Sequence, residues 1–370
     1  MRIARVDFFG YDLRYAHGEY VMSGGRTIAS LPSTVVRVEA EGGLVGWGET
    51  CPLGPTYLES HAGGARAALA ELAPALIGID PTNLAAVGDA MDGALRGHGY
   101  AKAALDIACW DLLGRAAGLP CATLLGGVRS VDFPLYVAIP LGPVDAMVAH
   151  VREQRALGIR RFQLKLGADP REDAARVRAV LSATEDGDVV IADANGGWRL
   201  QDALIAARAL EPLDRVLFEQ PCPTLEECLT IRERTTLPMV LDEVITDARA
   251  LIRAAGACEA VNLKLGRVGG LTAAKLIRDL GEALGVRFTI EDTWGGDLTT
   301  AAVAHLAAST RPDALLMASF MNDWTLDHIA GHQPRSHDGR GAAPTAPGLG
   351  VEPDPAALGP PLFTNAAENY

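Results

Sequence analysis

The sequence predicts an α/β protein whose main part is a (β/α) barrel, and two observations support this prediction. Between residues 161 and 294, six short apolar runs each end in a charged residue, at intervals of 22 to 28 residues. A stretch with helical periodicity, such as PREDAARVRAVLSAT, separates consecutive runs. A strand–helix unit that repeats at this length is typical of a barrel, in which the catalytic groups lie where the strands end.

The barrel strands are expected from residue 133 onward, where FPLYVAI begins. We expect eight strands, near residues 134–139, 161–166, 188–193, 214–219, 238–242, 260–265, 286–291 and 314–320. The helices between them are expected at 144–157, 171–184, 201–210, 224–234, 247–256, 271–284 and 298–310. The segment after residue 325 is rich in Gly, Pro and Ala and is predicted to be irregular, with a tail that packs back on another part of the molecule.

The first 125 or so residues predict a separate α+β domain. Apolar and polar residues alternate in RIARVDFFGYDL and STVVRVEA, and VGWGETC follows as a third strand, so an antiparallel sheet is expected. Helices are expected over 61–78, 82–95 and most of 100–127. Asp106 and Asp111 lie on the last of these, which is largely apolar, and we expect them to have structural roles such as capping or ion pairing.

Composition excludes several classes of partner. The net charge of −13 over 370 residues argues against nucleic acid and against an anionic membrane, because both require a positive surface. No apolar run approaches the roughly 18 residues of a membrane span, and the N-terminus reads as a strand without a signal peptide. The six cysteines form no CxxC pair, so buried thiols and a cytoplasmic location are expected.

Three carboxylates end consecutive strands and predict a metal site. Asp193, Glu219 and Asp242 would supply hard oxygen ligands, which suit Mg²⁺ better than Zn²⁺. The residues that follow these acids are expected to orient the ligands: Asn195, Gln220 and Glu243. The simpler alternative, three unrelated strand-end acids exposed to solvent, is disfavoured by their regular order between two lysines.

Lys165 and Lys264 end the strands immediately before and after the three acids. These positions would place two amines on opposite sides of a bound substrate. A desolvated lysine near a dication has its pKa lowered toward neutrality and can act as a base, while Mg²⁺ acidifies the α-proton of a bound carboxylate. One lysine would remove the α-proton, and the other would return a proton on the opposite face or assist departure of a β-substituent. A Schiff base and plain ion pairs remain alternatives.

The motifs QLKLG, ADANGGW, FEQP, LDE, NLKLGRVGGL and EDTWGGD, together with the 101–127 helix region, resemble the enolase superfamily in its muconate-lactonising branch. The resemblance implies a (β/α)7β modified TIM barrel with an α+β capping domain, with boundaries at 1–127, 128–325 and 326–370. It implies one Mg²⁺ per subunit at Asp193, Glu219 and Asp242, and Lys165 and Lys264 as the acid/base pair. It also implies an even-numbered homo-oligomer, such as a dimer or octamer.

One position departs from that branch, which usually has Lys-x-Lys on the second barrel strand. Here the first residue is Gln163, a neutral side chain that can hydrogen-bond a substrate but does not help to lower the pKa of Lys165. No His–Asp dyad of the mandelate-racemase type follows on the later strands. Gln-x-Lys with CPLGPTY, EDTWGGD and APGLG is similar to enzymes that act on proline derivatives, which include cis-3-hydroxy-L-proline dehydratases and proline-betaine or hydroxyproline-betaine 2-epimerases.

Substrate contacts are expected from the capping domain and the last barrel strands, at Tyr57, Asp292, Thr293, Trp294 and Phe320, besides Gln163. An aromatic wall would attract a cationic nitrogen by about 0.5–2 kcal/mol, whereas Trp324 is expected to be ordinary packing. An aromatic residue at 320, where the dehydratases tend to have an acid, favours an N-methylated ring. We therefore expect 2-epimerisation of proline betaine or 4-hydroxyproline betaine, with cis-3-hydroxy-L-proline dehydration as the alternative and a non-catalytic metal-binding scaffold as a remote third.

Overall fold

The barrel strands form one parallel sheet of eight strands. The computed structural model describes residues 1–367. The strand order β14-β13-β12-β11-β10-β9-β8-β7 follows the chain, and a parallel bridge between Leu135 and Ala318 joins the two edges. The strands are β7 (Val137–Ile139), β8 (Arg161–Lys165), β9 (Val189–Asp193), β10 (Val216–Glu219), β11 (Met239–Leu241), β12 (Ala260–Lys264), β13 (Arg287–Glu291) and β14 (Leu315–Ala318).

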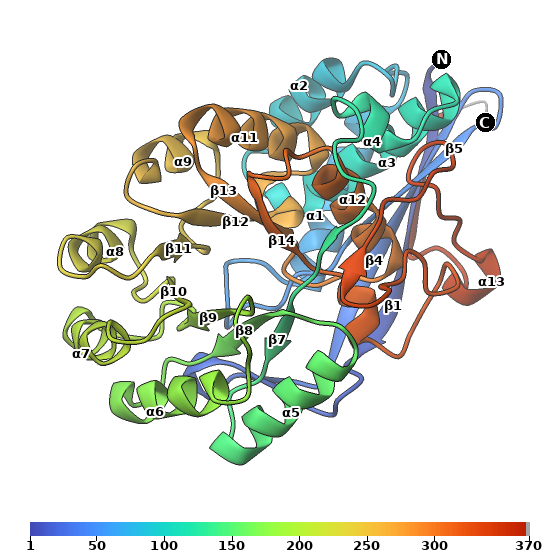
Figure 1. Cartoon of the computed structure of the whole chain (residues 1–370). Coiled ribbons are helices and arrows are strands. Elements are labelled where there is room, and N and C mark those ends of the chain that lie inside the picture. The colour runs from blue at the N-terminus through green and yellow to red at the C-terminus, as the bar shows by residue number, and fades with distance from the viewer. Residues whose placement is uncertain (368–370) are drawn as a thin grey trace.

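Helices surround this sheet on its outer side (Figure 1). Seven of them lie within a few residues of the predicted ranges: α5 (Val144–Ala156), α6 (Pro170–Leu181), α7 (Leu200–Leu210), α8 (Leu225–Arg232), α9 (Ala248–Ala254), α11 (Leu271–Leu284) and α12 (Asp297–Ala308). Caps explain several of the starts: Asp169 accepts from the backbone of residues 171 and 172 before α6, and Thr224 and Glu227 form a capping box on α8. The short helix α10 (Leu265–Val268), directly after β12, was not predicted.

The capping domain combines both ends of the chain. Its antiparallel sheet has the order β16-β1-β4-β5, formed by β1 (Ile3–Arg14), β4 (Ser30–Ala40), β5 (Val45–Thr50) and β16 (Phe363–Ala366). The helices are α1 (Ala62–Leu76), α2 (Leu84–Ala94), α3 (Gly99–Ala117) and α4 (Cys121–Leu124), and a small hairpin joins β2 (Tyr20–Val21) to β3 (Thr27–Ile28). Because β16 pairs with β1, the end of the described chain adds an edge strand to this domain's sheet.

Helix α3 connects the two domains and packs very close to β5. A Cβ at Gly48 would lie 2.0 Å from the carbonyl oxygen of Ala104, so only glycine permits this approach. Asp106 accepts hydrogen bonds from the backbone and hydroxyl of Thr272 at the start of α11. Asp111 accepts from the backbone N–H groups of Trp47 and Leu349. Both acids therefore have the structural roles expected of them.

The segment after the last barrel strand follows an irregular path, with the 3-10 helix η2 (Met321–Trp324), the two-residue strand β15 (Arg340–Gly341) and the short helix α13 (Pro355–Leu358). β15 pairs with β6 (Phe133–Pro134) just before the first barrel strand. All six cysteines are free, and five of them are buried. Within residues 1–367, every helix is too short or too polar to cross a bilayer.

Candidate active site

The predicted catalytic side chains lie together at the carboxyl ends of neighbouring strands. In the parallel register, Lys165 is the partner of Asp193, and Asp193 is the partner of Glu219. Asp242 follows β11, and Lys264 ends β12 beside Glu291 of β13. Asp193, Glu219 and Asp242 are 0% exposed, and Lys165 and Lys264 are 4% and 6% exposed. The charged side chains at successive strand ends, which the sequence predicted to converge, therefore lie in one buried cluster.

Lys165 is held by an ion pair. Its Nζ lies 2.5 Å from Oδ2 of Asp193. Burial disfavours the charged amine, but Asp193, Tyr20 and Glu219 outweigh that effect and raise the pKa of Lys165 well above its usual value. The carboxylates themselves stabilise the ammonium here. The lowered pKa that the sequence predicted applies to a lysine beside a bound dication and stays a prediction.

Asp242, the third of the three acids, lies at the centre of a second charged cluster. Its Oδ2 accepts from Lys264 Nζ at 2.9 Å and from the Tyr57 hydroxyl at 3.2 Å, and its Oδ1 accepts from Arg267 at 2.8 Å. Burial alone would raise the pKa of Asp242, but Arg267 and Lys264 together lower it. Burial likewise opposes the charge of Lys264, and Asp242 and Glu291 raise its pKa. Arg267 was not predicted as a site residue.

Glu219 differs from its neighbours because its carboxylate is bound only by amides. Gln163 Nε2 lies 2.9 Å and Asn262 Nδ2 2.7 Å from Oε1 of Glu219. Burial and the charges of Asp193 and Asp242 raise the pKa of Glu219 well above its usual value. Gln163 therefore contacts a proposed metal ligand, in addition to lining the cavity described below.

The three carboxylates fit a divalent cation by their chemistry. They are buried, and their mutual repulsion is relieved only by protonation or by a cation. Hard oxygen donors of this kind suit Mg²⁺. Across residues 1–367, however, no three His, Cys, Asp or Glu side chains have the arrangement of a metal centre. Lys165 and Lys264 instead form ion pairs with Asp193 and Asp242.

The residues that follow the three acids support them mainly through the backbone. The backbone N–H of Asn195 donates to Oδ1 of Asp193, and its side chain donates to Oε1 of Glu243. Gln220 accepts from the backbone N–H of Asp242 through Oε1. The pKa of Glu243 is raised to about 7 by burial and by the charges of Asp242 and Asp193. None of these three side chains hydrogen-bonds a proposed ligand carboxylate directly.

A small cavity lies against both lysines. Five of the six expected substrate contacts line it, namely Tyr57, Gln163, Asp292, Thr293 and Trp294. The remaining lining residues are Tyr20, Met22, Leu53, Tyr136, Lys165, Asn195, Lys264, Glu291, Met321 and Trp324. Capping-domain and barrel side chains thus enclose the same space.

Two aromatic predictions require correction. Phe320 does not line this cavity: it packs edge-on against Phe133, and its ring fills the space beside Gly341, where a Cβ would come within 2.6 Å of it. The last strand, expected to reach residue 320, ends at Ala318, so Phe320 lies beyond the strand end. Trp324, expected to be packing, lines the cavity and lies edge-on to Trp294.

Asp292 and Thr293 are largely engaged in the fold. Oδ2 of Asp292 accepts from the backbone N–H of Gly266 at 2.8 Å, and Oδ1 accepts from that of Thr293 at 2.7 Å. The Thr293 hydroxyl donates to the carbonyl oxygen of Cys51. Burial raises the pKa of Asp292 to about 6 despite these bonds. Asp292 therefore joins the ends of β12 and β13, and Thr293 joins the barrel to the capping loop.

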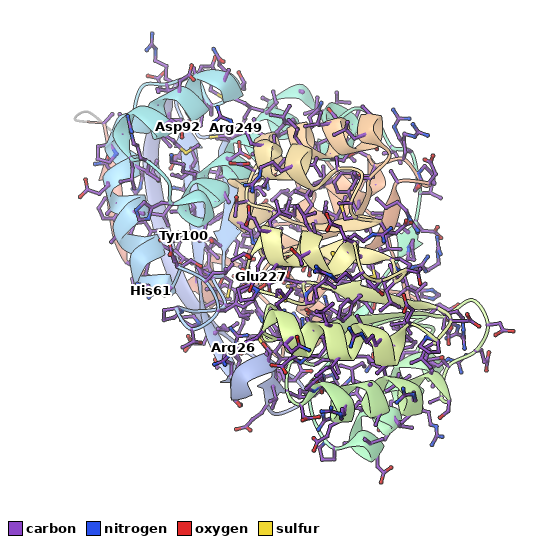
Figure 2. All side chains as sticks on the ribbon, turned by 90° about the vertical axis from the view of Figure 1, so that its left-hand side faces the viewer. Arg26, His61, Asp92, Tyr100, Glu227 and Arg249 are labelled. Atoms are coloured by element: carbon purple, nitrogen blue, oxygen red, sulfur yellow. The ribbon has the colours of Figure 1, made fainter. Side chains whose placement is uncertain are left out.

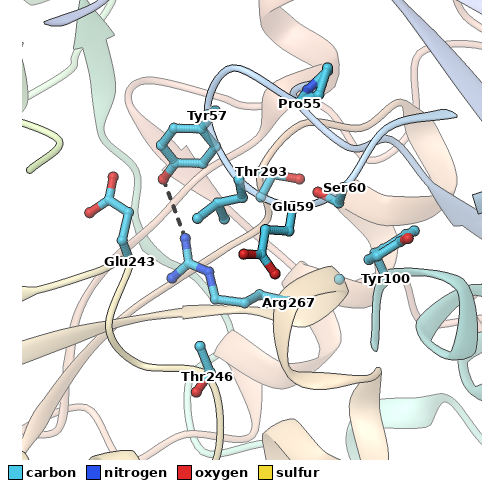
Figure 3. Close-up of a pocket in the computed structure, with 11 residues that line it drawn as sticks. Pro55, Tyr57, Glu59, Ser60, Tyr100, Glu243, Thr246, Arg267 and Thr293 are labelled. Carbon is cyan, nitrogen blue, oxygen red and sulfur yellow. Dashed lines mark hydrogen bonds between the residues drawn. The ribbon is translucent and has the colours of Figure 1, made fainter. Parts of the chain in front are cut away.

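A second, more open pocket lies outside the first. Figure 3 shows it between the capping loop with Pro55, Glu59 and Ser60 and the barrel residues Glu243 and Arg267. Tyr57, whose hydroxyl accepts from Arg267 at 3.3 Å, lines both spaces and separates them. Figure 2 shows the corresponding face of the molecule, with the capping domain beside the barrel helices. The outer pocket is therefore continuous with the domain boundary.

Strand alternation contained an unused signal for the residues that the sequence analysis missed. Side chains two positions apart on a strand share a face. Asn262 precedes Lys264 by two positions, just as Gln163 precedes Lys165. Arg267 follows β12 and Tyr136 precedes β7, so strand alternation does not indicate the orientation of either side chain.

Family models match most of the chain. The enolase C-terminal domain-like family matches residues 146–357, and the mandelate racemase/muconate lactonizing enzyme N-terminal domain matches residues 17–126. The chain is 46% identical over 364 residues to the cis-3-hydroxy-L-proline dehydratase of Roseibium aggregatum, covering 98% of this chain and 99% of that one. It is 29% identical to the N-succinyl-L-Arg/Lys racemase of Bacillus cereus, over 84% of this chain and 85% of the other.

Solved structures show the same similarity. A crystal structure of a mandelate racemase/muconate lactonizing enzyme from Roseovarius nubinhibens ISM superposes with a TM-score of 0.96 at 38% identity, over 100% of both chains. A member of the enolase superfamily from the same organism, complexed with magnesium, superposes with a TM-score of 0.92 at 39% identity, over 99% of this chain and 100% of that one. The chain belongs to the mandelate racemase/muconate lactonizing enzyme family of the enolase superfamily.

Proposed function

We propose that this protein is a Mg²⁺-dependent dehydratase of cis-3-hydroxy-L-proline. The observation that carries the choice of reaction is the 46% identity to a dehydratase of that name across nearly the full length of both chains. An aromatic residue at position 320 led to the prediction of 2-epimerisation. Since Phe320 packs against Phe133 outside the cavity, that reason for an N-methylated substrate no longer applies.

The geometry of the substrate ring requires a base on one face of the ring and an acid on the other. In cis-3-hydroxy-L-proline the hydroxyl shares a face with the carboxylate, so the α-proton lies on the opposite face. Lys165 on β8 and Lys264 on β12 line one cavity from either side of the acid-bearing strands β9 to β11. One lysine takes the α-proton and the other protonates the departing hydroxyl. The C2–H and C3–O bonds break, a C2=C3 double bond forms, water leaves, and the enamine tautomerises to a cyclic imine acid.

The three buried carboxylates Asp193, Glu219 and Asp242 would hold Mg²⁺. When bound, the ion would neutralise the carboxylates that otherwise keep the lysines protonated, and it would stabilise the charge that develops on the substrate carboxylate. Gln163 and Asn262 fix the orientation of Glu219, and Gln220 fixes the backbone of Asp242. The chain's own contribution is therefore a pair of opposed amines and a rigid set of oxygens in a site from which water is largely excluded.

The second candidate is 2-epimerisation of a proline betaine or 4-hydroxyproline betaine, which shares the first proton transfer. The aromatic side chains Tyr20, Trp294 and Trp324, in successive edge-on contacts along the cavity, favour it because such rings attract a quaternary nitrogen. In this reaction the second lysine would deliver a proton to C2 on the opposite face.

Proton NMR in D₂O with Mg²⁺ distinguishes the two reactions. cis-3-Hydroxy-L-proline, L-proline, proline betaine and 4-hydroxyproline betaine would each be incubated with the enzyme. Conversion of the 3-hydroxy compound to the cyclic imine acid is the expected result. Loss of a betaine α-proton signal with appearance of its epimer, and no dehydration, would assign the protein as the epimerase. Absence of α-proton exchange in all four would refute a proline-type substrate.

A further inference from the structure

At the carboxyl ends of the barrel strands, the formal negative charge exceeds what a divalent cation can balance. Six carboxylates gather at this end of the barrel, namely Asp193, Glu219, Asp242, Glu243, Glu291 and Asp292, against three cationic side chains, Lys165, Lys264 and Arg267. With every group ionised, addition of Mg²⁺ and of a substrate carboxylate still leaves a formal charge of about −2 by Coulomb counting. A cationic group on the substrate would be attracted to such a site.

Glu291 is the acid with an oxygen available for that group. It ends β13, is 2% exposed and lines the inner cavity. Its Oε2 accepts a hydrogen bond from the Tyr136 hydroxyl, whereas its Oε1 is buried without a hydrogen-bond partner. Lys264 Nζ forms an ion pair with that oxygen at 3.7 Å, beyond hydrogen-bond distance, and donates its hydrogen bonds to Asp242 and Tyr57.

The other two acids outside the proposed metal ligands do not offer the same opportunity. Both oxygens of Asp292 accept backbone N–H groups. Glu243 also has an unpartnered oxygen, but it lines the outer pocket and is not among the residues around the inner cavity. Within the described chain, Glu291 is thus the acid of this set that faces the substrate space with a free oxygen.

We propose that Glu291 binds the protonated ring nitrogen of the substrate and so selects a secondary amine over a quaternary one. The proposal rests on the proposed function, in that the substrate is a proline-type amino acid. A buried carboxylate oxygen without a partner is costly, and an R₂NH₂⁺ group can satisfy it with a charge-assisted hydrogen bond. An N,N-dimethylated nitrogen has no N–H to donate, and its methyl groups keep the charge at a greater distance. Tyr136 acts as a positioning residue that turns the free oxygen toward the cavity.

The test measures equilibrium binding rather than turnover. Trp294 and Trp324 line the cavity, so their fluorescence reports binding of ligands to the Mg²⁺-loaded enzyme. Three ligands isolate the nitrogen: L-proline, N,N-dimethyl-L-proline and tetrahydrofuran-2-carboxylate, in which oxygen replaces N–H. The wild-type enzyme should bind L-proline at least 10-fold more tightly than either analogue. Glu291→Gln should weaken L-proline by at least 10-fold and change the affinity for the two analogues by less than about 3-fold.

Two further variants sharpen the interpretation. Tyr136→Phe should weaken L-proline binding by less than Glu291→Gln, because it frees the carboxylate without removing it. Glu59→Gln removes an acid from the outer pocket and should leave the preference for L-proline unchanged. Equal wild-type binding of all three ligands, or an unchanged preference in Glu291→Gln, would overturn the proposal, as would equal loss of all three ligands in that variant.

Incubation of the wild-type enzyme with cis-3-hydroxy-L-proline tests the proposed function separately. Absence of imine acid with a Glu291-dependent preference for L-proline would remove the dehydratase assignment and keep the nitrogen-binding role. Dehydration without that preference would do the reverse.

Discussion

Lowering the pH should destabilise the protein through His305, which is buried in α12 away from the active site. Its Nδ1 accepts from the backbone N–H of Ala122 at 3.1 Å, and its Nε2 lies 3.0 Å from the carbonyl oxygen of Leu349. Both bonds require neutral imidazole with the proton on Nε2, because a proton on Nδ1 would face the Ala122 N–H. Burial lowers the pKa of His305 to about 4.

The magnitude follows from linkage. The usual pKa of histidine is about 6.5, so between pH 6.5 and 4 the unfolded chain binds a proton that the native state does not. The free energy of unfolding therefore falls as the pH falls through this window. The contribution of His305 at pH 5 is about 2 kcal/mol less than at pH 7.5, and it approaches a loss of roughly 3 kcal/mol at pH 4.

Urea titrations of the metal-free protein between pH 5 and 7.5 measure this effect, with His305→Gln as the comparison. Glutamine can accept from Ala122 and donate to Leu349 but does not titrate. Other buried groups titrate in the same range, and the difference between the two proteins cancels them. That difference should change by about 2 kcal/mol in favour of the variant as the pH falls. A difference independent of pH would show that His305 is not held neutral.

Four further outcomes are expected. Chelation of divalent ions should abolish α-proton exchange, and Mg²⁺ should restore it, as NMR in D₂O would show. Lys264→Ala should lower dehydration by about 10²- to 10⁴-fold, with unchanged turnover contradicting the two-lysine assignment. Gly48→Ala places a Cβ 2.0 Å from the Ala104 carbonyl oxygen and should destabilise by about 1–3 kcal/mol or more, whereas Gly88→Ala, whose Cβ meets no atom within 4 Å, should not. Phe320→Leu should lower the urea midpoint yet leave KM within a few-fold of wild type.

Strand ends were predictable because they obey two simple rules. Buried parallel strands read as short apolar runs, and the first polar residue marks the point where a strand leaves the core. The five residues Lys165, Asp193, Glu219, Asp242 and Lys264 follow from those rules, and the structure places all of them in one buried cluster. The barrel helices followed in the same way from their 3.6-residue period.

Tertiary contacts explain where the prediction stopped. Phe320 was oriented by extending β14 beyond Ala318, but the chain turns into η2 there, and the ring packs beside Gly341 from a segment distant in sequence. Arg267 belongs to a short helix that only the structure shows. Whether a buried carboxylate has a partner, as for the free oxygen of Glu291, depends on neighbours from several strands and cannot be obtained from periodicity.

The hydrogen-bond donors around each buried acid distinguish carboxylates that join elements of the fold from carboxylates that we propose to bind a cation. Asp106, Asp111 and Asp292 each accept backbone N–H groups from a second segment, so their charge is used to join elements of the fold. Glu219 has only amide donors, which come from β8 and β12, the strands next but one on either side of its own. Burial without a cation opposes ionisation. An acid such as Glu219 therefore lowers the stability of the fold. The most economical explanation is that a cation from outside the chain completes it, a divalent ion at Glu219 and, by the same reasoning, the substrate's own ammonium at Glu291.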